Sequence, residues 1–318
     1  MNAEFSSCSL NSCLQLLLIA FDTKLPTESF NSNLGIQLQK LHSTDVSLPL
    51  DPVSIRELIT DTEEARIQAE KDELVHLIKD PRELRRMLRI KNNSKLNLGT
   101  GQQCVRDFFV CIRENRESWI DVYSFLNYNV KDTTKCSNCG NISSNETREE
   151  IYTEVNCPTD GSNLSTCIEE YFNKGESVES TCELCHTKGL GEKRTLMVDV
   201  ETTKFFIIII RRTEMDYRGR AAINTNDVTC IGNVKLCDFR NCEAIFEPIC
   251  AVQHQGVLRE DGVSYGHYTA DVKEQRSSKW YRTSDNALPV PLSPSDVTKR
   301  GYVFLYKNVS FGLPSSRC

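Results

Sequence analysis

A cysteine near the start of the chain is the residue best placed for nucleophilic chemistry. Cys8 directly precedes an apolar pattern in which Leu10, Leu14, Leu17 and Phe21 recur at steps of three and four, as on one face of a helix. A thiol at a helix N-terminus lies at the positive end of the helix dipole, which favours the reactive thiolate. The sequence therefore predicts an activated thiol at position 8, although one cysteine alone does not define a site.

A histidine near the other end of the chain supplies a candidate base. His267 follows a loop, residues 259–265, and we expect it at the start of a strand. Such a histidine needs a hydrogen-bond partner on its second ring nitrogen, and Ser284 or Asp285 could provide it. Adjacent side chains of a strand point to opposite faces, so both can address His267 only if the strand bulges or turns. An early cysteine, a late histidine and a polar residue after it follow the order of papain-like cysteine hydrolases.

Two C-x-x-C pairs form a second candidate site. Each pair can present two thiolates to one ion, and two pairs complete the tetrahedral set that Zn²⁺ prefers. We therefore predict one structural zinc ion, held between two β-fingers; His186 could replace one thiolate, and the alternative is a reduced, metal-free set of thiols. The four expected ligands are Cys136, Cys139, Cys182 and Cys185.

Composition narrows the functional classes. The net charge is -6 and no basic stripe stands out, which argues against nucleic acid as a partner. The longest apolar runs, residues 14–21 and 205–210, are too short to cross a membrane. Fifteen cysteines that include two C-x-x-C pairs favour metal binding inside the cell over a disulfide framework, and no basic segment of a signal peptide precedes residue 13. We expect an intracellular protein, cytoplasmic or nuclear.

The order of the predicted elements indicates the fold class. Helical patterns occupy residues 8–22, 53–91 and 102–112, and strand-like runs follow. Helices first and strands later favour an α+β domain with a helical lobe packed on an antiparallel sheet. The run 205–210 is apolar at every position and should be a central strand buried on both faces. The strand-like runs are residues 120–125, 151–155, 195–200, 204–210, 248–253 and 302–306.

Taken together, these segments resemble the ubiquitin-specific protease family of deubiquitinases. The resemblance extends over nearly the whole chain and places six boxes in the family's order. In chain order, the matching segments are the cysteine box (6–15), the Q-Q box (102–109), the two zinc knuckles with the segment 165–176, the apolar strand ending in a basic residue (205–212), and the histidine box with its closing strand (251–256, 266–268, 280–285 and 302–306).

This resemblance implies a fold and an activity. The family has a papain-like fold with a helical thumb, an antiparallel β palm and zinc-bearing β fingers. On this chain it implies a single catalytic domain over residues 1–310, with the thumb at 1–118, the fingers at 119–203, the palm at 204–310 and a tail at 311–318. The implied reaction is thiol-dependent hydrolysis of the isopeptide or peptide bond after the C-terminal glycine of ubiquitin.

The resemblance also implies roles for individual residues. Cys8 would be the nucleophile, His267 the general base, and Ser284 or Asp285 the residue that orients the imidazole. The implied partner is ubiquitin or a ubiquitin-conjugated protein, with no nucleic acid and no membrane. The residues expected to contact the ubiquitin tail are Gln103, Cys104, Gly266 and Tyr268.

Several positions depart from the family pattern. The asparagine that donates to the oxyanion is replaced by Ala3, a glycine by Phe5, and the acidic residue that holds the ubiquitin tail by Cys104. Loss of an oxyanion donor costs about a hundredfold or more in rate. A catalytically weak or inactive ubiquitin-binding scaffold is therefore the alternative. The family's second acidic position lies near the oxyanion, so Asp285 is expected to compensate for Ala3.

Overall fold

The computed structural model divides the chain into two compact units, Met1–Phe125 and Leu126–Cys318. No described helix combines the length and the apolar character needed to cross a bilayer. Eleven described cysteines are free thiols and Cys242 is disulfide-bonded. The structure describes residues 8–23, 105–157, 163–215, 221–224, 226, 232–238, 240–258, 264–274, 277–284, 289–293, 296–297 and 301–310.

The described part of the first unit is helical. Helix α1 spans Cys8–Thr23 and packs on α5, which spans Val105–Glu114. The Cys13 thiol lies 4.0 Å from the carbonyl oxygen of Val105, at the point where the two helices meet. Both helices were predicted from apolar periodicity, and their observed extents confirm those predictions. The helix expected at residues 53–91 lies outside the described residues.

Residues 120–125 form a helix, and the predicted strand there is wrong. Helix α6 spans Ile120–Leu126. The buried residues Trp119, Val122, Tyr123 and Leu126 recur at steps of three and four, while Ile120 is exposed. The apolar residues therefore follow the helical period, and a run this short can be read either way from its sequence.

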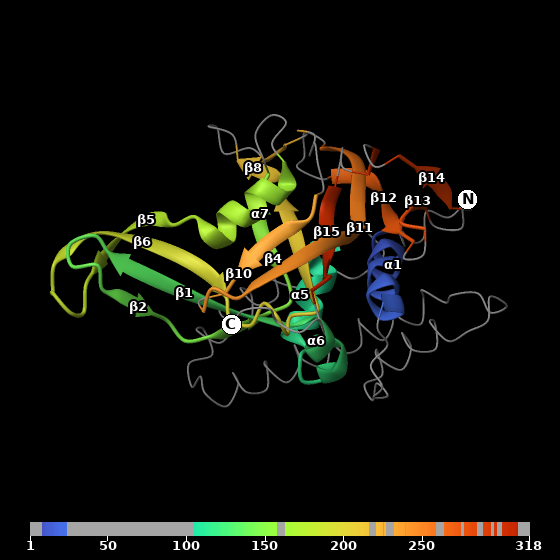
Figure 1. The fold of residues 1–318 in the computed structure, drawn as a ribbon. Helices are drawn as coiled ribbons and strands as arrows, with labels where there is room; N and C mark the ends of the chain where they lie inside the picture. Colours follow the sequence, from blue (N-terminus) through green and yellow to red (C-terminus); the bar gives the residue numbers. More distant parts are fainter. Residues whose placement is uncertain are drawn as a thin grey trace, which may run out of the picture. The chain divides into compact units, whose positions relative to one another are not determined.

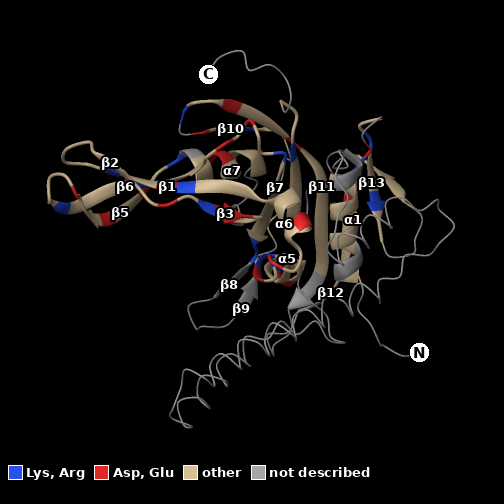
Figure 2. Cartoon of the chain, turned by 90° about the horizontal axis from the view of Figure 1, so that it is seen from below, with Lys and Arg blue, Asp and Glu red and all other residues tan. Residues whose placement is uncertain are grey.

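The second unit contains a sheet that carries both C-x-x-C pairs, named here the cysteine sheet. Its strand order is β2-β1-β6-β5, and β3 pairs with β1. Figure 2 shows acidic and basic residues of this sheet along β1, β3, β5 and β6. Asp132 on β1 forms ion pairs with Arg148, at 2.8 Å, and with Lys193, at 3.4 Å. The strands are β1 (Tyr128–Cys136), β2 (Ile142–Ser144), β3 (Arg148–Glu150), β5 (Glu176–Thr181) and β6 (Lys188–Met197).

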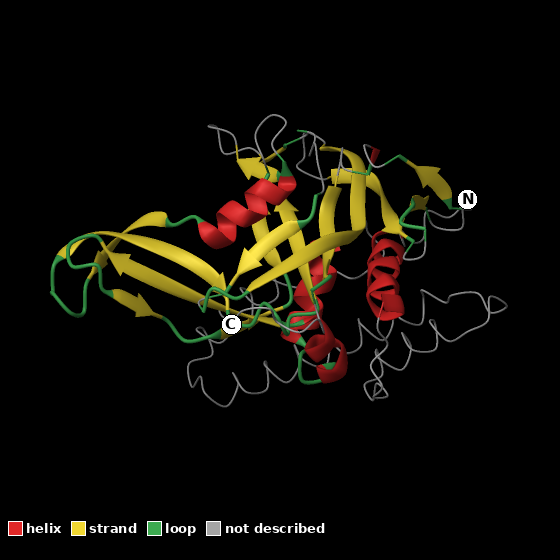
Figure 3. Ribbon diagram, in the orientation of Figure 1, coloured by secondary structure: helices red, strands yellow, loops and turns green. Residues whose placement is uncertain are grey.

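The larger sheet of the second unit carries His267 and is named here the histidine sheet. Its order is β14-β13-β12-β11-β15-β7-β4, with β10 paired to β11 (Figures 1 and 3). All its pairs are antiparallel except β4 with β7, so the sheet is mixed rather than purely antiparallel as expected. The chain returns from β4 to β7 only after α7 and two strands of the cysteine sheet, and such a long connection permits parallel pairing. The strands are β4 (Thr153–Asn156), β7 (Phe205–Arg211), β10 (Val234–Cys237), β11 (Glu243–Leu258), β12 (Ser264–Lys273), β13 (Trp280–Thr283), β14 (Val290–Leu292) and β15 (Gly301–Asn308).

Three further elements, one helix and two short strands, complete the described chain. Helix α7, Leu164–Asn173, begins at Asn163, whose side chain accepts a hydrogen bond from the N–H of Ser165. It packs on β4 and β10 of the histidine sheet and on β6 of the cysteine sheet (Figure 1). The short strands β8 (Thr213–Met215) and β9 (Ala221–Ile223) pair only with each other among the described strands.

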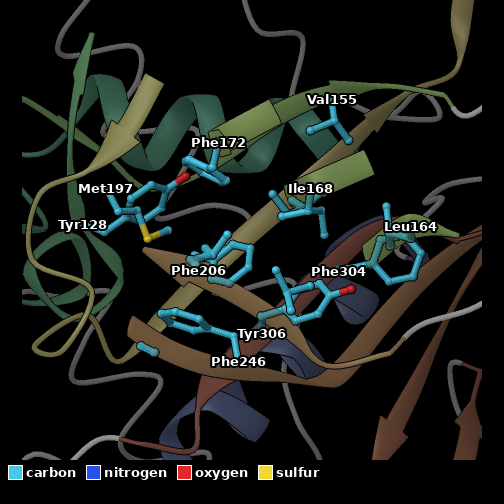
Figure 4. Packing of buried hydrophobic residues seen from close by; sticks show 14 of the residues in the cluster. Tyr128, Val155, Leu164, Ile168, Phe172, Met197, Phe206, Phe246, Phe304 and Tyr306 are labelled. Atoms are coloured by element: carbon cyan, nitrogen blue, oxygen red, sulfur yellow. The ribbon is translucent and has the colours of Figure 1, made fainter. Parts of the chain in front are cut away.

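The hydrophobic core of the second unit lies between α7 and the histidine sheet. Phe206 on β7 stacks on Tyr306 with ring centroids 4.9 Å apart and meets Phe246 edge-on at the same distance (Figure 4). Phe172 of α7 contacts Phe206 from the helix side. Residues 205–210 are buried at every position, which confirms the predicted strand with two buried faces. The other predicted strands are present, although the run 195–200 leaves its strand after Met197.

Candidate active site and metal centre

Cys8 is the first residue of α1, as predicted from the helical pattern that follows it. Its side chain is buried, with 6% exposed. The helix is anchored by Cys13, Leu16, Leu17 and Ala20, which have no exposed surface. The apolar face of α1 therefore fixes the position of Cys8 within the first unit.

His267 lies on β12 of the second unit and meets Ser284. Its Nε2 is 2.7 Å from the hydroxyl oxygen of Ser284, within hydrogen-bonding distance. β12 and β13 pair through Ala270 with Thr283, and Ser284 is the first residue beyond β13. The pairing of two strands thus brings together a histidine and a hydroxyl that lie 17 positions apart in the sequence.

Of the two candidates for orienting the imidazole, the structure brings Ser284 to His267. Asp285 lies outside the described residues, as do Gln103 and Cys104. The assigned role of each of these three residues stays a prediction.

Gly266 and Tyr268 flank His267 on β12. Gly266 pairs with Gly256 of β11, and Tyr268 pairs with His254. The rings of His254 and Tyr268 lie 4.5 Å apart, centroid to centroid. Burial lowers the pKa of His254 below its ordinary value of 6.5, so its imidazole is held in the neutral form.

A buried charge network, which the sequence analysis missed, lies on β11, β12 and β13. Arg282 on β13 donates to both carboxylate oxygens of Asp271 on β12, at 2.7 and 2.9 Å. Asp271 has no exposed surface, and burial raises its pKa against the opposing effect of Arg282. Gln253 on β11 donates to the same carboxylate and to the carbonyl oxygen of Val297, the latter at 2.8 Å. Only the strand register reveals these contacts, because the partners are far apart in the sequence.

The four predicted metal ligands come together at one end of the cysteine sheet. Their sulfur atoms all lie within 4.8 Å of one another. Cys136 and Cys185 are 3.8 Å apart, and Cys139 and Cys182 are 3.6 Å apart, sulfur to sulfur. Four thiolates bound tetrahedrally at about 2.3 Å from Zn²⁺ would be about 3.8 Å apart. The donor set and its spacing therefore fit a tetrahedral zinc ion with every coordination position filled by sulfur.

The two knuckles share one backbone form. The residue after the second cysteine of each pair has a positive φ, 72° at Gly140 and 54° at His186. Its N–H donates to the carbonyl of the first cysteine, at 2.9 Å in both knuckles. His186 thus occupies the turn position that glycine fills in the other knuckle, which accounts for its place in the sequence without a role as a ligand.

Polar side chains surround the sulfur cluster. Asn138 lies 3.6 Å from the Cys185 sulfur, and Asn141 lies 4.0 Å from that of Cys182. Hydrogen bonds from Thr187 and Asn138 lower the pKa of Cys185 to about 5. Donors of this kind stabilise the thiolate form that a metal requires.

Comparisons with known proteins support the fold. No family model and no curated protein sequence matches the chain. Among solved structures, the chain is similar to one in the SAGA DUB module Ubp8/Sgf11/Sus1/Sgf73 bound to monoubiquitin, with a TM-score of 0.67 and 15% identity over 96% of this chain and 67% of the other. The fold is like that of Ubp8.

A second structure of the same module, bound to ubiquitin aldehyde, gives a TM-score of 0.62 at 16% identity, covering 96% of this chain and 68% of that one. A yeast SAGA DUB module carrying a variant Sgf73 gives 0.57 at 15% identity, with 95% and 66% covered. The chain spans about two thirds of the length of these structural relatives. Since the identities are low, the similarity to the Ubp8 structures shows the fold and does not establish a reaction.

Proposed function

We propose that the chain is a cysteine-dependent deubiquitinase that hydrolyses the isopeptide or peptide bond after the C-terminal glycine of ubiquitin. The observation that carries the proposal is the hydrogen bond between His267 and Ser284. It occurs in a chain with a Ubp8-like fold, whose buried Cys8 begins a helix. A histidine held by a hydroxyl, together with a thiol at a helix start, is a set suited to nucleophilic catalysis.

In the proposed reaction the Cys8 thiolate attacks the carbonyl carbon of the terminal glycine. His267 takes the thiol proton on Nδ1 and returns it to the leaving amine, and a thioester forms. Water then attacks the thioester while His267 accepts its proton; the C–S bond breaks, the ubiquitin carboxylate leaves, and His267 returns the proton to the Cys8 thiolate. Ser284 accepts the hydrogen bond from Nε2–H and holds the ring in the tautomer that exposes Nδ1 for this work.

The remaining assignments complete the proposal. Residues 1–310 act as one catalytic domain, and Gln103, Cys104, Gly266 and Tyr268 contact the ubiquitin tail. One zinc ion, held by the four clustered cysteines, ties two hairpins together and takes no part in the chemistry. Most described cysteines are free thiols, which suits a reducing intracellular compartment.

The decisive experiment is labelling by a ubiquitin that carries a C-terminal electrophile. Wild-type protein should form one covalent adduct, and Cys8→Ala should form none. Cys13→Ala is the matched control, since Cys13 lies on the same helix and is fully buried, and it should keep the labelling. An adduct that persists in Cys8→Ala and maps to Cys13 would refute the assignment.

A second function is favoured by Ala3 and Cys104, which replace an oxyanion donor and an acidic tail contact expected from the family pattern. In that case the chain binds ubiquitin without turning it over. Binding of ubiquitin in the micromolar range, with no adduct and no hydrolysis by the wild-type protein, would select this alternative.

A further inference from the structure

The position of Ser284 depends on how β13 is registered against β12. Ser284 follows the last residue of β13, so its hydroxyl is carried to His267 by the end of that strand. β13 has only four residues, each paired with one residue of β12. A slip by one residue would turn every side chain of β13 to the other face. Something must therefore fix this short strand in its register.

The contact between Asp271 and Arg282 has the geometry to do so. Asp271 and Arg282 are direct register partners in the β12–β13 pair. Arg282 engages both carboxylate oxygens, and such a bidentate bond is satisfied in one relative position of the two strands. Arg282 lies two residues before Ser284, and Asp271 four residues after His267. Since side chains two and four apart share a face of a strand, the ion pair and the proposed catalytic pair lie on the same face.

The buried end of the contact is itself fixed by a third strand. Gln253 of β11 donates to the Asp271 carboxylate and to the carbonyl oxygen of Val297. The carboxylate thus joins β12 and β13 to β11, and Gln253 extends this network to Val297. Arg282 reaches a carboxylate whose place in the sheet is already set.

We propose that Asp271 and Arg282 are positioning residues that lock β13 in register on β12, so that the Ser284 hydroxyl meets the His267 ring. The inference rests on the proposed function for the importance of that meeting. Neither residue acts on the substrate. Their effect reaches His267 only through Ser284.

A stabilising role alone is a poor account of this pair. A buried ion pair is often replaceable by apolar residues at little cost in stability. Ser284, in contrast, offers one uncharged hydroxyl. Its hydrogen bond is lost if the distance between the hydroxyl oxygen and Nε2 grows by about 1 Å. A neutral orienting group therefore needs a more exact backbone position than a carboxylate would.

The test combines a double-mutant cycle with a spectroscopic readout. Asp271→Asn keeps the shape of the side chain and removes its charge, and it is made in the wild-type and Ser284→Ala backgrounds. Arg282→Lys is the milder second variant, because it keeps the charge and loses the bidentate bond. Asp238→Asn is the matched control, since Asp238 is also buried and paired to an arginine, Arg240, at 2.8 Å, away from β12 and β13.

We expect Asp271→Asn to lower kcat on a ubiquitin–fluorophore substrate on the order of tenfold, as for a small misplacement of a catalytic group, with KM nearly unchanged. In the Ser284→Ala background the same change should have almost no further effect. Arg282→Lys should give a smaller fall in kcat, and Asp238→Asn none. Additive effects of Asp271→Asn and Ser284→Ala, or an equal fall for Asp238→Asn, would overturn the inference.

The ring-nitrogen NMR shifts of His267 supply a readout that needs no turnover. Wild-type protein should show a single tautomer, Asp271→Asn and Arg282→Lys should show a tautomer mixture, and Asp238→Asn should match the wild type. If the wild type fails to hydrolyse ubiquitin, the proposed function fails while these shifts still decide the positioning role. Unchanged shifts in Arg282→Lys and Asp271→Asn would refute it even in an active enzyme.

Discussion

In the histidine sheet, six of the seven residues of β7 are buried, whereas β5 of the cysteine sheet has no buried residue. The first sheet is packed against α7 through the edge-on contact of Phe172 with Phe206, whose ring stacks in turn on Tyr306. The second has long exposed stretches, and its apolar side chains Ile142, Leu184 and Leu190 are each at least 60% exposed. The two sheets belong to one unit of the chain, and they use different interactions to hold their strands.

The difference has a physical reason. One end of the cysteine sheet joins the hydrophobic core through Tyr128, Val130 and Met197. Strands β2 and β5 have no buried residue and gain little from removing apolar surface from water, so they must be held by other means. The cysteine sheet has charged contacts around Asp132, which contribute modestly at a surface, and one cluster of four thiols. The β1–β6 pairing joins the two hairpins along their length, and the cluster is the strongest candidate for what holds their exposed ends together. Metal removal and core truncation should separate the two sheets, whereas changes at Ser284 and His254 should act within the histidine sheet.

Metal removal should give the largest effect, and only in the cysteine sheet. A structural zinc site contributes on the order of 10 kcal/mol in small zinc domains. Chelation, or Cys185→Ser, should therefore abolish amide-exchange protection in β1, β5 and β6 while β7 and β15 stay protected. Metal analysis of the untreated protein should give about one zinc per chain. Cys237→Ser, a cysteine outside the cluster, is the control and should change neither measurement.

Truncation of the aromatic core should destabilise the histidine sheet next most strongly. Phe206→Ala removes a ring with no exposed surface and should lower the free energy of unfolding by about 3–5 kcal/mol. Leu190→Ala on the cysteine sheet should change it by less than about 0.5 kcal/mol, because Leu190 is exposed. Denaturant unfolding of the two variants measures both values. Equal losses would remove the contrast between the sheets.

Within the histidine sheet, changes at Ser284 should alter rate far more than stability. Ser284→Ala should lower kcat about tenfold, which corresponds to about 1.4 kcal/mol and so to roughly the net value of one orienting hydrogen bond, with an unchanged melting temperature. Ser284→Asp should leave kcat unchanged or raise it, since a carboxylate stabilises the imidazolium. Asp285→Ala should cost more than Ser284→Ala if Asp285 serves the oxyanion. The rate of ubiquitin–fluorophore hydrolysis by the three variants tests this division of roles. Normal turnover by Asp285→Ala together with an inactive Ser284→Ala would contradict it.

The smallest effect concerns His254 and acid. Because burial lowers its pKa below 6.5, the folded protein binds fewer protons at this site than the unfolded chain does at low pH. The free energy of unfolding should therefore fall as the pH drops below 6.5. His254→Gln removes the titrating group and should flatten that part of the pH profile. A profile that keeps its slope in the variant would assign the acid sensitivity to other groups.

Local patterns in the sequence predicted part of this structure. The spacing of Cys136, Cys139, Cys182 and Cys185 indicated one cluster, because C-x-x-C turns have a fixed local form. The run 205–210 indicated a buried strand, because every residue in it is apolar. The run 120–125 was misread, since six residues hold less than two helical turns and do not fix a period.

Contacts that depend on strand register could not be predicted. Asp271 and Arg282 meet because β12 and β13 pair in one particular way, and nothing local marks either residue as a partner of the other. For the same reason, the residues alone left both Ser284 and Asp285 as candidates, and only the family resemblance placed Ser284 on the face of His267. Alternation along a strand says that two neighbours face opposite sides, and only the register says which side faces His267.

The path of the chain through the cysteine sheet limits how this protein could be rebuilt. The chain enters that sheet in β1–β3, leaves it for β4 and α7, and returns in β5 and β6. The two knuckles therefore lie in two separate segments of the chain, and the residues between these segments include β4 of the histidine sheet. Deleting residues 136–185 as one block would remove β4 and the whole of α7, the helix that covers the core. A transplant of the metal-bearing end into another protein would need two grafts, joined by the β1–β6 pairing and by the ion.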